Sequence, residues 1–177
     1  MIYKFRIISD ESREFARELL IDSAHTFLDF HHCLQKDLEY DPAQLSSFFI
    51  TNNSWEKQQQ ITLIDMMDEE GGNCATMEKC IIGDHFDKKG QRMLYVYDFF
   101  SERSFFIELT EVLDISESKA LPKVVFSHGD PPPQINLGLD DLTLSEDDLG
   151  GDPGGPFPDD DFDDNIDFMD TDDFPNE

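Results

Sequence analysis

The chain has 177 residues, of which 13 are Lys or Arg and 40 are Asp or Glu, so its formal net charge is −27. This charge argues against direct nucleic-acid binding, which needs cations to replace the counterions of phosphate, and against docking on an anionic membrane. No apolar run approaches the roughly 20 residues of a transmembrane helix, and no basic segment followed by an apolar one opens the chain. We therefore expect neither a membrane span nor a Sec-type export signal.

The cysteines indicate a reducing compartment. There are three, Cys33, Cys74 and Cys80, and an odd number without an export signal favours free thiols over a disulfide framework. Five residues separate Cys74 from Cys80, more than the about two to four residues of a zinc knuckle. We therefore expect a cytoplasmic protein without a structural metal ion or another cofactor.

Composition changes sharply near Ser127. Lys123 is the last basic residue, and 17 acids with no Lys or Arg follow from Gly129 to the end of the chain. Seven of the nine prolines and six of the ten glycines also lie beyond Ser127, which disfavours long helices and strands there. High charge with low hydrophobicity makes independent folding unfavourable. The composition predicts a folded domain over residues 1–126 and a disordered acidic tail over residues 127–177.

Three segments open the predicted domain. Residues 3–7 alternate between apolar and basic side chains, which is typical of a half-buried strand. Residues 13–22 are ambiguous, because their propensities favour a helix whereas their apolar side chains also fit one face of a strand. Residues 26–38 form the clearest helix, in which Thr26 and Asp29 have the spacing of a capping box and a stripe of apolar residues recurs at helical spacing. Asp41-Pro42 would end this helix.

The rest of the domain is expected to consist mainly of strands. Residues 45–51 and 58–63 are strand candidates, and residues 65–90 are rich in turn signals. Residues 93–113 give the best hairpin signal, with a short loop at residues 101–103. The order predicts an α+β domain with a small mixed, mostly antiparallel sheet and one main crossing helix.

Three features resemble a known family, the plasmid pRiA4b ORF-3-like proteins, which include TnpR-type passenger proteins of mobile elements. They are Arg17 in the second element, the helix start Thr26-Phe27-Leu28-Asp29-Phe30-His31, and the strand Tyr95-Val96-Tyr97-Asp98-Phe99. The resemblance covers about residues 1–115. It implies that residues 13–22 form the second strand of an N-terminal hairpin, and that the fold is β-grasp-like. The family has no known molecular function.

The chain also departs from that family. The family commonly continues Tyr-Asp-Phe with Gly-Asp-x-Trp, whereas this chain continues with Phe100-Ser101-Glu102-Arg103. A late acidic, glycine-containing segment of the family is reduced here to the sequence Gly-Asp-Pro-Pro-Pro at residues 129–133. An activity that needed those acidic residues would be lost.

The candidate site residues in the domain each have a structural alternative. His25, Asp29, His32 and Lys36 share one helical face, but this face is opposite the apolar stripe, so an ordinary solvated surface is expected rather than a metal site. His31 lies on the apolar face, where a histidine usually packs with one satisfied hydrogen bond. The remaining family-motif candidates are Arg17, Thr26, Tyr95, Tyr97 and Asp98. Asp98 would orient Arg103 or Arg17, or accept a backbone N–H in the turn.

The acidic tail contains regularly spaced aromatic residues. Phe157, Phe162, Phe168 and Phe174 recur every five or six residues among acids that include Asp159, Asp160, Asp161, Asp163 and Asp164. Acidic segments with interleaved hydrophobic residues can dock into basic, apolar grooves and become ordered on binding. The alternative is a tail that only increases solubility.

Three functions are compatible with the sequence. The first, which we favour, is a non-enzymatic cytoplasmic interaction or accessory protein whose tail binds a basic partner protein. The second is a nucleic-acid mimic or an accessory factor of a mobile element. The third is a small enzyme with its site near His31, Tyr97 and Asp98. The sequence indicates no oligomeric state and no substrate.

Overall fold

The computed structural model describes residues 1–64, 75–114 and 120–135, all of which lie in one compact unit, Met1–Leu137. The strands of these residues are β1 (Ile2–Ser9), β2 (Ala16–Asp22), β3 (Ser47–Thr51), β4 (Lys57–Thr62), β5 (Ala75–Thr76), β6 (Arg92–Asp98), β7 (Arg103–Leu113) and β8 (Lys123–His128). The helices are α1 (Phe27–Leu38) and the short 3-10 helix η1 (Ile82–Asp84).

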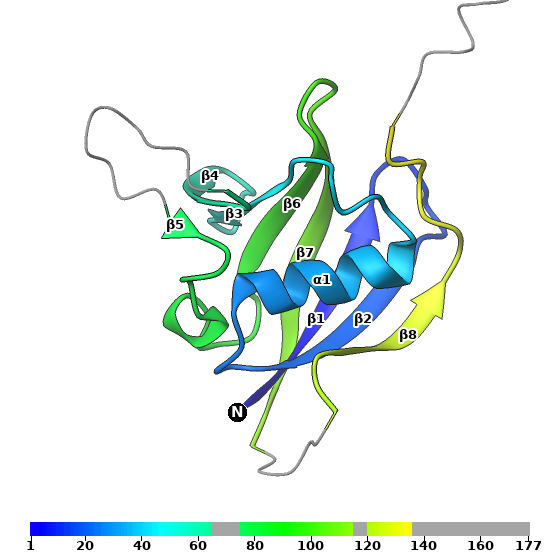
Figure 1. Cartoon of the computed structure of the whole chain (residues 1–177). Coiled ribbons are helices and arrows are strands. Elements are labelled where there is room, and N and C mark those ends of the chain that lie inside the picture. Colours follow the sequence, from blue (N-terminus) through cyan, green and yellow to red (C-terminus); the bar gives the residue numbers. More distant parts are fainter. Residues whose placement is uncertain (65–74, 115–119, 136–177) are drawn as a thin grey trace, which may run out of the picture. The chain divides into compact units, whose positions relative to one another are not determined.

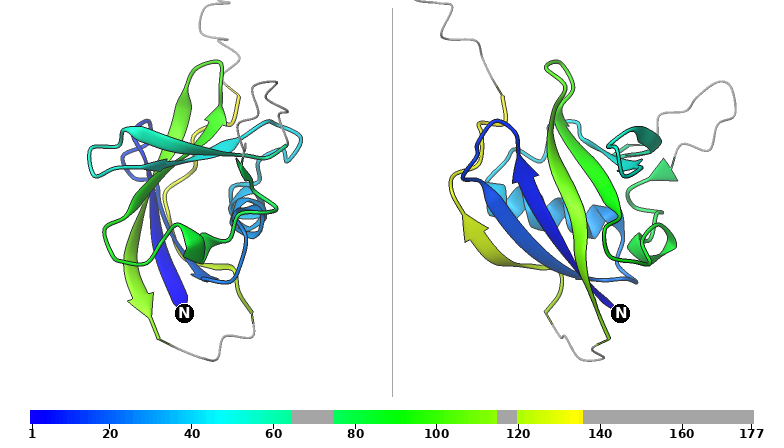
Figure 2. Two further views of the ribbon diagram at one scale, coloured as in Figure 1. Left: turned by 90° about the vertical axis from the view of Figure 1, so that its left-hand side faces the viewer. Right: turned by 180° about the vertical axis from the view of Figure 1, so that it is seen from behind.

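Within the described residues, the strands form one eight-stranded sheet in the order β5-β4-β3-β6-β7-β1-β2-β8. Neighbouring strands are antiparallel except for β4 and β5, which are parallel. Helix α1 crosses one face of this sheet, and the core lies between the two layers (Figures 1 and 2). The α+β prediction is therefore confirmed: a mixed, mostly antiparallel sheet with one crossing helix. The N-terminal hairpin, the helix and the further strands follow one another in the predicted order, and β1 pairs antiparallel with both β2 and β7.

Tertiary pairing resolves the ambiguity of residues 13–22. β2 is hydrogen-bonded to β1 on one side and to β8 on the other, so both edges of its backbone are satisfied without a helix. Its alternate residues Arg17, Leu19 and Ile21 are buried on the face that contacts the core. The strand implied by the family resemblance is thus correct, and the helical propensity of this stretch is overridden.

Helix α1 begins where the sequence predicts. The Thr26 hydroxyl accepts the Asp29 backbone N–H at 3.2 Å, and an Asp29 carboxylate oxygen accepts the Thr26 backbone N–H at 2.9 Å, which forms the predicted capping box. Phe30 on the buried face makes edge contacts with the rings of Phe5 and Phe48. The helix ends at Leu38, and Glu39 adopts the left-handed conformation that terminates many helices.

The last described segment extends the folded body. The predicted boundary between residues 126 and 127 lies inside β8, and the chain after it follows the body of the protein up to Ile135. Gly129 has a φ of 65°, and a Cβ atom built there would lie 2.6 Å from the Glu14 carbonyl oxygen, so this close approach requires glycine. Residues 127–135 were assigned to the tail from composition, but the structure places them against the domain. Residues 136–177 lie outside the described residues.

Candidate functional site

Two family-motif residues, His31 and Tyr95, meet in a buried polar cluster between α1 and β6. Nδ1 of His31 lies 2.8 Å from the Tyr95 hydroxyl, and Gln35 Nε2 donates to the same hydroxyl at 2.6 Å. The Ser46 hydroxyl lies 3.3 Å from Nδ1 of His31. All four side chains are at least 96% buried, since their exposed fractions run from 0% to 4%. This cluster joins the helix to the sheet and offers no surface to a ligand.

Burial also determines the charge of the cluster. It lowers the pKa of His31 to about 4, with a smaller contribution from His32, and it raises the pKa of Tyr95 to about 12. His31 is therefore uncharged at neutral pH. The Tyr95 hydroxyl accepts from Gln35 and can donate its proton to Nδ1 of His31, so the polar atoms in contact are complementary. This agrees with the structural alternative considered for His31, a core histidine with a satisfied hydrogen bond.

Arg17 links three segments of the fold. Its Nε donates to Oδ2 of Asp37 on α1 at 2.7 Å, and its Nη1 donates to the carbonyl oxygens of His128 at 2.8 Å and Gly129 at 3.0 Å. The guanidinium also lies 4.6 Å from the centre of the Phe15 ring. Arg17 is 6% exposed, so its charge serves the fold. It holds the segment after β8 against β2 and α1.

Tyr97 belongs to a second cluster, centred on Arg103. Nε and Nη2 of Arg103 donate to the two carboxylate oxygens of Glu11 at 2.7 and 2.6 Å, a bidentate ion pair. The Tyr97 hydroxyl donates to the same carboxylate at 3.3 Å. The hydrogen bonds from Arg103 lower the pKa of Glu11, whereas burial raises the pKa of Tyr97. Both groups therefore keep their ordinary protonation state at neutral pH.

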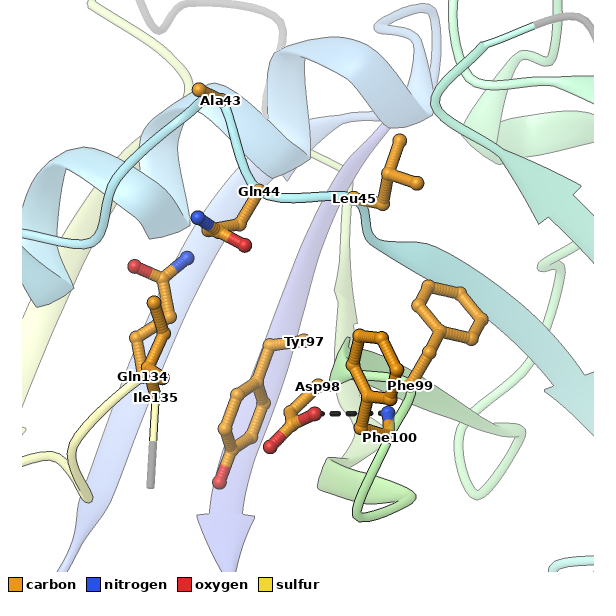
Figure 3. A pocket seen from close by; sticks show the side chains of 9 residues that line it. All are labelled: Ala43, Gln44, Leu45, Tyr97, Asp98, Phe99, Phe100, Gln134 and Ile135. Atoms are coloured by element: carbon orange, nitrogen blue, oxygen red, sulfur yellow. Dashed lines mark hydrogen bonds between the residues drawn. The ribbon is translucent and has the colours of Figure 1, made fainter. Parts of the chain in front are cut away.

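Asp98 organises the turn between β6 and β7. Its Oδ1 accepts the backbone N–H of Phe100 at 3.0 Å, drawn in Figure 3, and that of Ser101 at 3.3 Å. Its other oxygen lies 3.8 Å from Nη1 of Arg103. Of the alternatives considered for Asp98, the structure shows the turn contact and the proximity to Arg103, whereas Arg17 pairs with Asp37.

The residues considered for an enzyme site are not assembled into one. His31 is enclosed in the core with Tyr95, whereas Tyr97 and Asp98 use their polar atoms on the Arg103 cluster and on the turn. Thr26 caps helix α1 and forms an antiparallel bridge with Ile81. No buried nucleophile or second acid joins His31 to Asp98 among the described hydrogen bonds. The geometry therefore does not support a catalytic role for this set.

A surface pocket of about 470 Å³ lies beside Asp98 (Figure 3). Three segments that are far apart in the sequence line it: residues 43–45 before β3, residues 97–100 at the end of β6, and residues 134–135. Four apolar residues of the lining are exposed to solvent: Leu45, Phe99, Phe100 and Ile135. Phe100 is fully exposed, with a relative exposure of 103%. We call this hollow the Phe100 pocket. Its lining is mostly apolar.

Side-chain contacts hold the walls of the Phe100 pocket in place. The Gln134 amide donates to the Asp41 carbonyl oxygen at 3.0 Å and accepts the Asp41 backbone N–H at 2.7 Å. The Tyr40 hydroxyl donates to the carbonyl oxygen of Pro132. The Asp98 contacts described above fix the third wall. The backbone of the walls is thus held in place by these contacts, whereas the fully exposed Phe100 ring is not covered.

The charge around the Phe100 pocket is negative. Residues 41–45, 97–102 and 134–135 include Asp41, Asp98 and Glu102 but no Lys or Arg. Arg103, the next residue along the chain, is 9% exposed and engaged by Glu11. Its Nη1 also lies 3.8 Å from Asp98 and donates to the Gln134 carbonyl oxygen at 3.4 Å, so it offsets part of the charge of Asp98 and leaves Asp41 and Glu102 as the exposed acids. An apolar recess with an acidic surround favours a ligand that is apolar and carries positive charge beside its apolar part.

Sequence reasoning did not find this pocket. It treated Phe100 only as a departure from the family motif, and it did not single out Leu45 or Ile135. One signal was available, because two consecutive phenylalanines at the end of a strand cannot both be buried in a tight turn. The contribution of Leu45 and Ile135 could not be found this way, since only the fold brings them to the turn.

The remaining predictions concern the acidic tail, metal binding and membrane spans. The tail candidates, Phe157, Phe162, Phe168, Phe174, Asp159, Asp160, Asp161, Asp163 and Asp164, all fall in residues 136–177. Among residues 1–64, 75–114 and 120–135 there is no group of three His, Cys, Asp or Glu side chains that could hold a metal ion. In the same ranges no helix is long and apolar enough to cross a membrane.

The fold defines a class of small α+β domains in which one helix covers a mainly antiparallel sheet. The family model described as plasmid pRiA4b ORF-3-like protein matches residues 1–139, and the chain belongs to this family. The match extends beyond the roughly 115 residues over which the sequence motifs indicated the resemblance. It thus includes β8 and the segment that lines the Phe100 pocket.

One solved structure supports the fold. A crystal structure of a protein of unknown function, MM3350 from Methanosarcina mazei Go1, is similar with a TM-score of 0.56 and 21% sequence identity, over 71% of this chain and 68% of that chain. At this identity the likeness concerns the fold alone. A comparison with curated proteins finds no match.

Proposed function

We propose that this protein is a non-enzymatic, cytoplasmic interaction or accessory protein that binds a basic partner protein through its acidic, Phe-containing C-terminal segment. The observation that carries the proposal is the run of 17 acids with no Lys or Arg after Ser127, interrupted by Phe157, Phe162, Phe168 and Phe174. Long-range attraction by these acids would accelerate encounter with a cationic surface. Insertion of the aromatic rings would then slow dissociation.

The geometry of the domain supports a binding role over catalysis. The polar family-motif residues are used within the fold, and one accessible feature among the described residues is an apolar pocket with acidic residues beside it. Exposed apolar recesses of this kind mark places where other molecules bind.

The proposal is tested with three full-length proteins. They are the natural chain, a variant with the four tail phenylalanines replaced by alanine, and a variant with Asp159, Asp160, Asp161, Asp163 and Asp164 replaced by asparagine. Each is used as bait in a nuclease-treated lysate of the source organism, and captured proteins are identified by mass spectrometry and then purified for affinity measurement. We expect a basic protein that binds the natural chain at least about tenfold more tightly than either variant. A partner that binds all three proteins equally would refute the proposal.

The alternative function is a nucleic-acid mimic or an accessory factor of a mobile element. Its supporting observation is the density of carboxylates, which resembles the charge of a phosphate backbone. Competition decides between the two functions. If duplex DNA displaces the purified partner, the protein occupies a nucleic-acid-binding surface, whereas a partner that stays bound in saturating DNA excludes mimicry.

A further inference from the structure

We propose that the Phe100 pocket receives an apolar side chain of the basic partner protein, at a place where Arg or Lys residues flank that side chain. This inference rests on the proposed function, to which it adds a defined docking site on the folded domain. The partner segment would thus be recognised by an apolar anchor in the pocket and by cations beside it.

Exposure of the pocket residues is the first argument. Phe100 lies at the turn after β6 with its ring in solvent, while Leu45 and Ile135 from the other two walls are 48% and 50% exposed. Their apolar surface surrounds a hollow of about 470 Å³, a size that accommodates one or two side chains (Figure 3). Leaving this surface in water is unfavourable, and covering it with an apolar side chain recovers the loss.

Preorganisation is the second argument. Asp98 fixes the turn that carries Phe100 by accepting two backbone N–H groups, and the Gln134 amide is held by two hydrogen bonds to Asp41. The backbone of the walls therefore does not have to become ordered on binding, and the Phe100 ring is the part that would have to settle on the ligand. A preformed site loses less entropy on association, so a short partner segment can bind measurably.

Charge complementarity selects the occupant. The segments that form the pocket carry Asp41, Asp98 and Glu102. The neighbouring Arg103 is buried, paired with Glu11 and close to Asp98, so the exposed charges beside the pocket are those of Asp41 and Glu102. A second copy of this chain would bring the same acidic surround against itself, and like charges oppose that contact. An apolar anion is disfavoured for the same reason. A partner segment with an apolar anchor between cations satisfies both properties of the surface.

The test uses full-length protein and three dye-labelled peptides. The first is Arg-Arg-Gly-Leu-Phe-Gly-Arg-Arg, the second replaces Leu-Phe with Ala-Ala, and the third replaces every Arg with Glu. Binding is followed by fluorescence anisotropy at low and at physiological salt. The protein variants are Phe100→Ala and the control Phe126→Ala, which removes another exposed ring, 48% exposed against 103% for Phe100, from β8, away from the pocket. Because both rings are exposed, neither change should unfold the domain.

The proposal predicts a defined pattern. The Leu-Phe peptide should bind the natural protein at least about tenfold more tightly than the Ala-Ala peptide. Phe100→Ala should weaken the Leu-Phe peptide at least about fivefold and leave the Ala-Ala peptide unchanged, whereas Phe126→Ala should change neither. Equal binding of the two Arg peptides, or a Leu-Phe affinity that Phe100→Ala does not alter, would overturn it.

A fourth protein, the full-length variant with four alanines in place of the tail phenylalanines, separates this inference from the proposed function. If that variant loses the preference for Leu-Phe while Phe100→Ala keeps it, the tail selects the apolar residues, and only the pocket inference fails. If the Glu peptide binds as tightly as the Arg peptide, both fail. Sedimentation of the natural protein tests the other occupant, since a dimer that Phe100→Ala dissociates would assign the pocket to a second copy and overturn the inference.

Discussion

The buried cluster around Tyr95 gives the sharpest prediction about stability. Tyr95→Phe removes only the hydroxyl group and keeps the ring, which packs 4.8 Å from the centre of the Phe48 ring. The Gln35 amide then loses the acceptor of its 2.6 Å hydrogen bond, and its oxygen already has no partner. His31 keeps only the longer contact with Ser46, at 3.3 Å. The substitution therefore leaves polar groups in the core unsatisfied while changing almost no volume.

The magnitude follows from the number of groups affected. An unsatisfied buried donor or acceptor costs about 1–3 kcal/mol. Here the Gln35 amide loses its hydrogen-bond partner, and the His31 imidazole loses the shorter of its two contacts. We expect Tyr95→Phe to lower the free energy of unfolding by about 2 kcal/mol, close to a 30-fold change in the folding equilibrium. This is a large part of the roughly 5–15 kcal/mol typical of a domain.

Urea denaturation at pH 7, followed by the fluorescence of the single tryptophan and by circular dichroism, measures this change. The double variant Tyr95→Phe with Gln35→Met is the control, because it also removes the Gln35 amide that Tyr95→Phe leaves without a hydrogen-bond acceptor. It should be more stable than Tyr95→Phe alone. A Tyr95→Phe protein within about 0.5 kcal/mol of the natural chain would refute the reasoning.

Three further predictions concern pH, the helix cap and the last described segment. Folding lowers the pKa of His31 from 6.5 to about 4, so the unfolded chain binds the proton first, and stability should decline as the pH drops from 6.5 to 4, by up to about 1.4 kcal/mol per pH unit. Urea titrations across this pH range should show a shallower decline for His31→Gln than for the natural chain. Parallel curves for the two proteins would contradict the argument. Thr26→Ala removes the side-chain cap of α1 and should lower the stability measured in a thermal melt by about 1 kcal/mol, whereas Thr26→Ser should be nearly neutral. An alanine variant as stable as the natural chain would show that the cap contributes nothing. Gly129→Ala places a Cβ against the Glu14 carbonyl at a φ of 65° and should lower the free energy of unfolding by at least about 1 kcal/mol. Faster amide exchange of residues 129–135 should accompany this loss of stability. A variant as stable as the natural chain would disprove the close approach.

The elements that the sequence predicted well are those with local signals. The capping box at Thr26 and Asp29 and the apolar stripe that follows identify α1 because a helix is stabilised by residues three and four positions apart. The alternation at residues 3–7 and the hairpin near residues 93–113 appear as β1, β6 and β7, because alternating apolar and polar residues are likewise a local signal, here of a strand. By contrast, residues 13–22 needed the family resemblance, since their own propensities favour a helix.

The candidate site could be predicted only in part. The family motifs singled out His31, Tyr95, Tyr97 and Asp98 as site candidates, but they did not indicate the surroundings that the structure shows for these residues. Tyr95 is 64 positions from His31, so no spacing rule could pair the two or show that they are enclosed in the core. The tail residues stay a prediction, because they lie outside the described residues.

By itself, the sequence determined the class of the fold, the position of its helix, the uneven distribution of charge and the family. These properties follow from composition and from patterns that repeat over a few residues. Only the tertiary structure decided that residues 127–135 continue the folded body, that the polar motif residues stabilise the fold, and that Leu45, Phe100 and Ile135 surround one pocket. The physical reason is that pairing of distant strands and packing of distant loops depend on the whole chain, and such contacts leave no periodic pattern in the sequence.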